Sequence, residues 1–137
     1  MSMATDDAAK IWSLNYQVLL SVIASVETDI TALGLESKEL FLLAEIDDHP
    51  FPAELASTMS MPKPTVTVYL KRLEAAGFVR RQIDPADLRR HRLELTPAGR
   101  QAARHGLALL SDAFGKRLER LTRAQQRELK KLLEQIL

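Results

Sequence analysis

The chain has 137 residues, of which 46% are apolar, and its formal net charge is only +1. A chain of this length and composition has enough aliphatic side chains to fill the core of one small domain and to fold unaided. It contains no cysteine, which excludes a disulfide framework, an iron–sulfur cluster and redox sensing through a thiol.

The N-terminal part of the chain predicts neither a membrane span nor a secretory signal. Its longest strongly apolar run, Val18 to Ala24, is far shorter than the roughly 20 residues that a membrane span needs. The acidic start from Met1 to Asp7 lacks the basic region of a signal peptide. We therefore expect a cytoplasmic protein with no membrane partner.

The first predicted helix runs from Asp6 to Leu33 and ends at Gly34. Its apolar side chains step by four and three residues without interruption, as in the seam of a coiled coil. The members of this seam are Trp12, Tyr16, Leu19, Ile23, Val26, Ile30 and Leu33. The stripe has too few partners within one chain if the middle of the chain folds by itself, which favours a second copy. The alternative is that the terminal helices pack on each other within one chain.

A shorter helix is predicted from Ser37 to Asp47, before a break at Pro50. Its inward-facing residues are predicted to be Leu40, Leu43 and Ala44. We interpret the cluster Asp47-Asp48-His49 at its end as a polar helix terminus. The three histidines follow no metal-ligand spacing, and no phosphate loop or nucleophile arrangement is present in the sequence. The sequence therefore predicts no enzyme, no metal site and no cofactor.

Two short helical patterns follow, from Pro52 to Met59 and from Lys63 to Leu73, with a turn around Ser60 to Pro62 between them. Pro52 fits the first turn of a helix, where its missing amide hydrogen costs little. Ala56 is small enough to let a second helix cross closely, as in a helix-turn-helix. The second pattern has an inward apolar stripe, which consists of Val66, Tyr69, Leu70 and Leu73.

The next segment predicts a β-hairpin. Gly77 suits a left-handed helix end, and Phe78 to Ile83 and His91 to Leu95 alternate apolar and polar residues as strands do. Between them, Asp84 to Arg90 is typical of a turn, with two arginines at its tip. A helix-turn-helix that continues into strand, turn and strand is the order of a winged helix-turn-helix, which binds duplex DNA.

A third helical region begins after Thr96 and is divided at Thr122, which has the character of a helix cap. Two apolar stripes follow its two parts, made of Ala103, Leu107, Leu110, Phe114, Leu118 and Leu121, and then Leu129, Leu132, Leu133 and Ile136. We expect residues 1–34 and 100–137 to form the dimerisation region of a two-fold homodimer. Residues 35–99 then form the winged helix-turn-helix DNA-binding region, within one structural domain per chain.

The formal charge is distributed unevenly along the chain. Residues 1–59 hold 2 basic and 10 acidic side chains, a net charge of −8. Residues 60–105 hold 10 and 4, a net charge of +6, and residues 106–137 hold 7 and 4, a net charge of +3. The basic part coincides with the second short helix and the hairpin, which indicates a surface for the phosphate backbone. Ordinary solvated charge is the alternative interpretation.

These residues resemble the MarR family of bacterial transcriptional regulators over nearly the whole chain. The resemblance rests on the segment LEAAGFVRR, on Asp87 and Arg89 two residues apart, and on the Leu95-Thr96-Pro97-Ala98-Gly99 segment that follows. It implies a mainly α fold with a small β-hairpin wing and dimerisation through both ends. It also implies that Arg89 at the wing tip enters the minor groove while Asp87 braces the wing; a plain turn residue is the alternative for Asp87.

Three positions depart from the pattern of the family. Pro62 stands where a serine or threonine often caps the recognition helix, so that the cap comes from elsewhere or is absent. Val68 occupies a position that is often arginine, and Leu88 replaces a polar or basic wing residue. These departures leave the number of phosphate contacts and the target sequence open.

The candidate DNA-binding residues lie on the second short helix and on the hairpin. Those expected at the major groove are Lys63, Thr65, Thr67 and Lys71, with Lys71 and Arg72 closer to phosphates than to bases. The methyl groups of Thr65 and Thr67 are candidates for contact with thymine. In the minor groove we expect Arg89, with Arg90 and Arg92 on the flanking phosphates. Two such surfaces one helical turn apart predict a pseudo-palindromic target.

The sequence therefore predicts a sequence-specific transcriptional regulator with double-stranded DNA and a second copy as its partners, and the resemblance implies a repressor rather than an activator. The resemblance also implies release by a small aromatic or lipophilic effector, with Trp12 and Tyr16 as candidates for its pocket. Their heptad positions favour core or interface packing instead. The alternatives are a winged-helix module that binds another protein, whose binding would not depend on salt, and an architectural DNA-binding protein without site preference.

Overall fold

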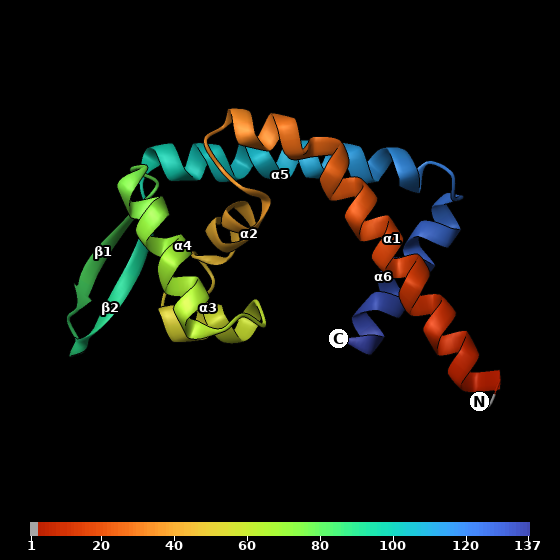
Figure 1. Cartoon of the computed structure of the whole chain (residues 1–137), viewed down its shortest axis with the longest axis horizontal. Helices are drawn as coiled ribbons and strands as arrows, with labels where there is room; N and C mark the ends of the chain where they lie inside the picture. The colour runs from red at the N-terminus through yellow and green to blue at the C-terminus, as the bar shows by residue number, and fades with distance from the viewer. Residues whose placement is uncertain (1–2) are drawn as a thin grey trace. The chain divides into compact units, whose positions relative to one another are not determined.

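The computed structural model describes residues 3–137 of the chain (Figure 1). This part of the chain is mainly helical with a two-stranded antiparallel sheet, which confirms the predicted fold class. The elements are α1 Met3–Ala32, α2 Ser37–Glu45, α3 Pro52–Thr58, α4 Lys63–Ala75, β1 Val79–Asp84, β2 Asp87–Leu95, α5 Pro97–Leu118 and α6 Arg123–Ile136. The chain divides into two compact units, one of Met1–Val26 with Leu110–Leu137 and the other of Glu27–Leu109.

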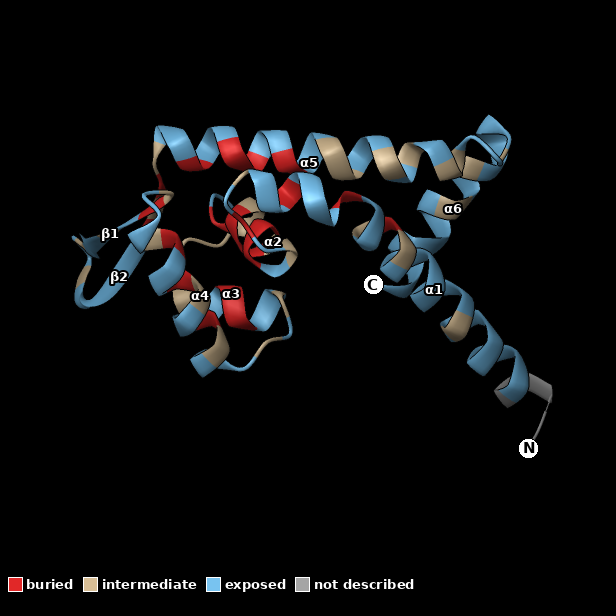
Figure 2. Cartoon of the chain, turned by 45° about the horizontal axis from the view of Figure 1, so that its top comes forward, coloured by how far each residue is buried: buried red, intermediate tan, exposed pale blue. Residues whose placement is uncertain are grey.

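The unit Glu27–Leu109 contains most of the buried side chains. Figure 2 shows them gathered on α2, on the facing parts of α3 and α4, and on the first half of α5. Those that are almost fully buried are Ile30, Leu40, Leu42, Leu43, Ile46, Leu55, Val66, Leu70, Leu73 and Leu93. In α2, Leu40 and Leu43 are buried as predicted and Ala44 is half-buried; Leu42, and Ile46 directly after the helix, are buried as well. This helix is therefore covered on more than one side.

Three helices of this unit end with a residue in the left-handed conformation and with the same pattern of two backbone hydrogen bonds. Gly34 and Gly77 terminate α1 and α4, with φ of +83° and +80°, as their positions in the sequence predict. At the end of α4, for example, the amide of Phe78 donates to the carbonyl of Leu73 at 2.9 Å. The third such residue is Ser60 after α3, with φ of 51°, where a side chain makes the left-handed conformation costly.

The wing, which we define as β1, β2 and the turn between them, has a tighter turn than the sequence predicts. Only Pro85 and Ala86 form the turn, and not the whole of Asp84 to Arg90. Ile83 pairs with His91 whereas Asp84 pairs with Asp87. Because of this irregularity, Leu88 to Arg90 have no partners on β1, and the two arginines lie in β2 next to the tip. A β-bulge of this kind bends the strand and redirects side chains.

Thr96 joins the end of α4 to the start of α5. Its hydroxyl donates to the carbonyl of Gly77 at 2.6 Å and accepts from the amide of Gly99 at 3.0 Å. Its own amide donates to the carbonyl of Phe78 at 3.1 Å. The threonine therefore caps α5 and ties that helix to the segment between α4 and β1, which explains why the sequence has Thr96 followed by Pro97 in the first turn.

In the other unit, α6 begins with a cap that the sequence predicts. The hydroxyl of Thr122 accepts from the amide of Gln125 at 3.1 Å, and the Gln125 side chain accepts from the amide of Thr122 at 2.9 Å. This reciprocal pair is a capping box. No residue of α6 is buried, although the helix is strongly amphipathic. Its apolar side is therefore only partly covered by the described residues, with Leu129 half-buried.

The predicted seam of α1 is buried only in its second half. Val22, Val26 and Ile30 are buried, in steps of four rather than alternating four and three, and Ile23 is half-buried. The first half remains exposed within one chain, with Ile11, Trp12, Leu14, Tyr16, Val18, Leu19 and Leu20 at the surface.

Among the described residues, no single helix is both long and apolar enough to cross a membrane. Helices α1 and α2 together reach the length and apolar composition of a membrane span, but only as a pair with a sharp bend between them.

Candidate nucleic-acid interface

Helix α4 separates an apolar side from a cationic side. Val66, Leu70 and Leu73 are buried against the rest of the unit, and Tyr69 is half-buried beside them, as the sequence predicts. The opposite side, which we call the outward face of α4, consists of Lys63, Pro64, Thr67, Val68, Lys71 and Arg72, all of them exposed. Thr65 is half-buried at its edge. A helix exposed in this way, second in a helix-turn-helix, has the position of a recognition helix.

The N-terminus of α4 has no side-chain cap. Pro62 stands at the cap position, and its carbonyl accepts from the amides of Thr65 and Val66 at 3.0 and 3.2 Å. Pro64, within the first turn, has no amide hydrogen to satisfy. The positive end of the helix dipole therefore remains without a compensating side chain, which suits an approaching phosphate.

Polar side chains on the outward face are engaged to different degrees. The hydroxyl of Thr67 donates to the carbonyl of Lys63 at 3.0 Å. Arg72 lies 3.4 Å from a carboxylate oxygen of Glu36 and 5.7 Å from the ring centroid of Tyr69. Within residues 3–137, neither Lys63 nor Lys71 forms an ion pair. The two lysines are thus the cations of this face that are available to a polyanion.

At the wing tip, Asp87 holds the backbone of Arg89. Its Oδ1 accepts from the Arg89 amide at 3.0 Å and lies 3.8 Å from the Arg89 Nε. The Arg89 side chain is 96% exposed. An exposed ion pair at this distance contributes little energy, so that the backbone hydrogen bond is the firmer part of the contact. A contact from an aspartate to the amide two residues on suits both a brace and a plain turn residue, and it leaves the guanidinium exposed.

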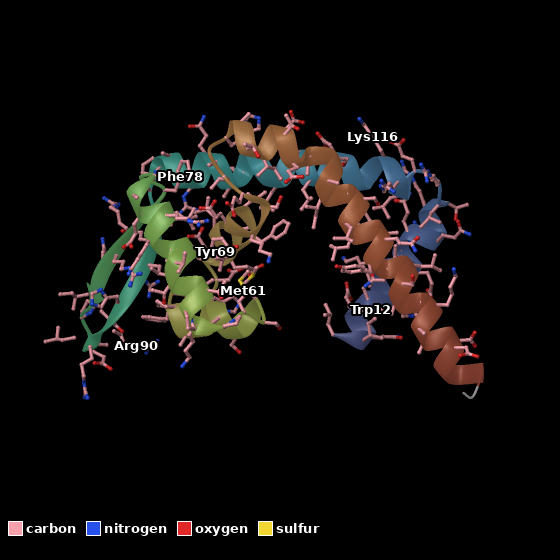
Figure 3. All side chains as sticks on the ribbon, viewed as in Figure 1. Trp12, Met61, Tyr69, Phe78, Arg90 and Lys116 are labelled. Carbon is pink, nitrogen blue, oxygen red and sulfur yellow. The ribbon has the colours of Figure 1, made fainter. Side chains whose placement is uncertain are left out.

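Arg90, by contrast, is folded back against α3. Figure 3 labels Arg90 beside the wing tip. Its Cζ lies 3.6 Å from the ring centroid of Phe51, and its Nη2 lies 3.8 Å from a carboxylate oxygen of Glu54. Close by, the amide of Leu93 donates to the carbonyl of Pro50 at 2.7 Å. Stacking over an aromatic face and pairing with a carboxylate together attach the wing to the start of α3.

Sequence reasoning missed Phe51 and Glu54 as partners of the wing. The available signal was an aromatic residue immediately before a proline at a helix start, which leaves its ring at the surface of the helix end. Arg92, the third predicted arginine of β2, has its Cζ 5.9 Å from the same ring and is exposed. Phe51 is therefore shared by two arginines of the wing, at unequal distances.

The remaining arginines around the wing have carboxylate partners. Arg81 pairs with Glu74 at 2.8 Å, and Arg80 approaches Glu94 at 3.4 Å. Arg100 on α5 contacts both carboxylate oxygens of Asp47 at 2.6 and 3.3 Å. The hydrogen bonds from Arg100 to Asp47, and then the charge of Asp47, raise the pKa of the Arg100 guanidinium. Asp47 is therefore part of a link from the end of α2 to α5, consistent with a polar terminus.

Trp12 and Tyr16, the candidates for an effector pocket, stack on each other in the first unit. Their ring centroids are 5.9 Å apart, and the residues are 65% and 46% exposed. Neither lines the groove of about 650 Å³ in this unit, which is bordered by Phe114, Leu118, Arg123, Gln126, Arg127, Leu129, Lys130 and Leu133. Within the described residues, no three His, Asp or Glu side chains are placed to hold a metal ion.

The helix pair, the wing and the exposed cations define a winged helix-turn-helix protein. A sequence model of the MarR family matches residues 33–90. The HTH-type transcriptional repressor Rv2887 of Mycobacterium tuberculosis is 32% identical over 136 residues, which cover 98% of each chain. The repressor Mb2911 of Mycobacterium bovis matches equally well, with 32% identity over 98% of each chain. The chain belongs to the MarR family.

Solved structures agree with this assignment. The complex of Rv2887 with salicylic acid is 32% identical, with a TM-score of 0.73 over 90% of this chain and 93% of that one. A crystal structure of MarR is 25% identical, with a TM-score of 0.80 over 90% of this chain and 86% of that one. A mutant MarR from E. coli complexed with operator DNA shares the fold, with a TM-score of 0.80, 22% identity and 99% coverage of both chains.

Proposed function

We propose that this chain is a sequence-specific DNA-binding transcriptional repressor that binds a pseudo-palindromic promoter site as a homodimer. The observation that carries the proposal is the cationic surface of α4 and the wing, where Lys63, Lys71 and Arg89 are exposed. Its curated relatives are transcriptional repressors. The protein acts by binding, without chemistry of its own, and it acts in the cytoplasm where promoter DNA is found.

The predicted DNA contacts have unequal support in the structure. Lys63, Thr67 and Lys71 lie on the outward face of α4, where the major groove would be, with the half-buried Thr65 at its edge and Arg72 partly occupied by Glu36. Arg89 extends freely for the minor groove. Arg92 is exposed for a phosphate, whereas the stacked and ion-paired Arg90 fits a role in holding the wing.

The two ends of the chain supply the proposed dimer contacts, as expected for residues 1–34 and 100–137, and residues 35–99 supply the DNA-binding region. Large apolar side chains are exposed along the first half of α1, and α6 buries none of its residues. A second copy is the natural cover for such helices in a two-fold assembly. The exposed stack of Trp12 on Tyr16 suits packing at this interface, and it equally suits contact with an effector.

We further propose that a small aromatic or lipophilic effector releases the repressor. One solved relative at 32% identity was crystallised with salicylic acid. A ligand that binds better to a conformation with a different separation of the two DNA-binding regions would lower operator affinity, because coupling between two sites is reciprocal. Salicylate titrated into the protein–operator complex should then raise the dissociation constant of the operator.

Selection of duplexes from a random pool by the purified protein tests the main proposal. We expect an enriched pseudo-palindrome with half-sites about one helical turn apart, some 10–10.5 base pairs. Affinity for it should fall steeply as salt rises, because phosphate contacts release counterions. A salt slope without site preference would indicate an architectural DNA-binding protein. Failure to enrich any duplex at low salt, with salt-independent capture of a protein partner, would indicate an interaction module.

A further inference from the structure

Val68 lies at the centre of the outward face of α4. At 3.6 residues per turn, position 68 points away from the direction shared by the buried Val66, Leu70 and Leu73. Its side chain is 50% exposed. Pro64 precedes it by four residues and is exposed on the same side, one turn closer to the N-terminus. The middle of the proposed DNA-reading surface is therefore apolar, although the candidates chosen from the sequence are polar or cationic.

The neighbouring threonine adds to this apolar centre. Because the hydroxyl of Thr67 donates to the Lys63 carbonyl at 3.0 Å, it has no hydrogen left to donate to a base. Thr67 keeps its methyl free for contact, together with the acceptor lone pairs of its hydroxyl oxygen. Three adjacent positions, Pro64, Thr67 and Val68, therefore offer carbon rather than hydrogen-bond donors.

Cations surround this apolar centre. Lys63 lies at the N-terminal end of the face and Lys71 at the next turn after Val68, neither of them with a carboxylate partner among residues 3–137. A cationic rim suits phosphates on both sides of a groove. The apolar group that a duplex presents between its phosphates, on the major-groove side, is the C5-methyl of thymine.

We propose that Val68 is a specificity-determining residue that contacts the C5-methyl of a thymine in each half-site, with the Thr67 methyl beside it. The proposal rests on the proposed operator binding and names the chemical feature that the operator must carry. An aliphatic side chain cannot hydrogen-bond to O6 and N7 of guanine. Discrimination at this base pair therefore comes from the methyl contact.

Replacement of single thymines by deoxyuridine tests the proposal directly. The probe is the tightest duplex recovered from the random pool, and deoxyuridine removes the methyl without changing base pairing, the minor groove or the phosphates. At the thymine facing Val68 we expect about fourfold weaker binding for each methyl removed, from about 0.8 kcal/mol for a buried CH₂ at 1.4 kcal/mol per tenfold. Both half-sites together should give about sixteenfold.

The variants V68A and I83A separate the contact from general effects. V68A should bind the thymine duplex about as weakly as wild type binds the deoxyuridine duplex, and should lose the difference between them. I83A removes an exposed β-branched side chain of the wing, which is 58% exposed, and should keep the full difference. Since Val68 is half-exposed, V68A should unfold at the temperature of wild type. If V68A failed to fold, the deoxyuridine series on wild type would still test whether a methyl contact exists, and V68Q, which places a good helix former at the same exposed position, would test whether residue 68 makes it.

Two results would overturn the proposal. One is equal wild-type affinity for the thymine and deoxyuridine duplexes at every position, which would leave operator binding itself intact. The other is a V68A variant that still discriminates between them as wild type does, which would assign the methyl contact to another residue. A pool from which no duplex is enriched at low salt would overturn the proposed function and this inference with it.

Discussion

Gly99 lies directly against the carbonyl of Phe78, with no room for a β-carbon between its backbone and that oxygen. The same carbonyl accepts from the amide of Thr96 at 3.1 Å. The first turn of α5 is therefore pressed onto the segment between α4 and β1, and the backbone of Phe78 is fixed by this bond. Glycine at position 99 is a requirement of close approach, since a backbone oxygen cannot move aside as a flexible side chain can.

Replacement of Gly99 by alanine should destabilise the protein. We expect a loss of about 1–3 kcal/mol in the free energy of unfolding, the usual cost of overpacking a tight site. Chemical denaturation at fixed protein concentration measures it. Gly115 in the same helix is the matched control, because nothing lies within 4 Å of a β-carbon there. G115A should be neutral or stabilising by about 0.5–1 kcal/mol through helix propensity, and equal losses in both variants would contradict the packing argument.

Replacement of Arg89 by alanine should weaken operator binding and leave the fold unchanged. The side chain is 96% exposed, and its removal should therefore leave the free energy of unfolding unchanged. We expect about 1–3 kcal/mol of lost binding free energy, as for removal of a base-contacting arginine. Arg104, an exposed arginine of α5, is the control for the same change in charge. Unchanged affinity in R89A would refute the placement of Arg89 in the groove, and loss of folding would make Arg89 structural.

Replacement of Asp87 is a test in which charge and geometry predict opposite changes in DNA affinity. Removal of a negative charge near phosphates should by itself strengthen DNA binding. If Asp87 braces Arg89 through the hydrogen bond at 3.0 Å, D87A should weaken binding in spite of the charge. D87N keeps an acceptor oxygen and should retain most of the affinity. Stronger binding by D87A would identify Asp87 as a plain turn residue.

Arg90 can be distinguished from a phosphate-binding residue by the dependence of affinity on salt. Loss of one phosphate contact lowers the slope of log affinity against log salt by about 0.9. If Arg90 acts by holding the wing on Phe51 and Glu54, R90A should weaken binding at every salt concentration with little change in slope. F51A should have a similar effect, and the double variant should be less than additive. A slope reduced by about one in R90A would assign Arg90 to a phosphate.

The exposed first half of α1 predicts the oligomeric state. Ile11 is 66% exposed within one chain, so that I11D should be harmless to a monomer and disruptive to a dimer built on this helix. We expect wild type to sediment as a dimer at micromolar concentration and I11D to shift toward monomer. I83D, the same change at the exposed wing residue, should remain dimeric. A wild-type protein that sediments as a single copy would contradict the proposed assembly.

Local signals made most of the fold predictable. Gly34, Gly77 and Thr122 each mark a helix boundary through backbone conformation or a side-chain cap, and such signals act within a few residues of sequence. The buried stripe of α4 was predictable for the same reason, because a helix has a fixed period.

The features that sequence reasoning missed depend on contacts between distant segments. The wing turn is short because β2 bulges at Leu88 to Arg90, and the strand pattern alone does not show which residues pair across a hairpin. The stack of Arg90 on Phe51 joins residues 39 positions apart. The sequence singles out Val68 as a departure from the family pattern but not as a base contact, because an aliphatic side chain in a cationic segment cannot hydrogen-bond to a base; its half-exposed place between the lysines is what the structure adds.

The hydroxyl group of Thr96 forms hydrogen bonds with two segments: it donates to the carbonyl of Gly77, just after α4, and accepts from the amide of Gly99, in the first turn of α5. Because the donor and an acceptor site of this hydroxyl hold both segments, we expect little relative movement between the end of α4 and the start of α5. A rotation of the start of α5 must therefore carry the end of α4 with it. We therefore expect a displacement of the first turn of α5 to be transmitted through Thr96 to the proposed recognition helix.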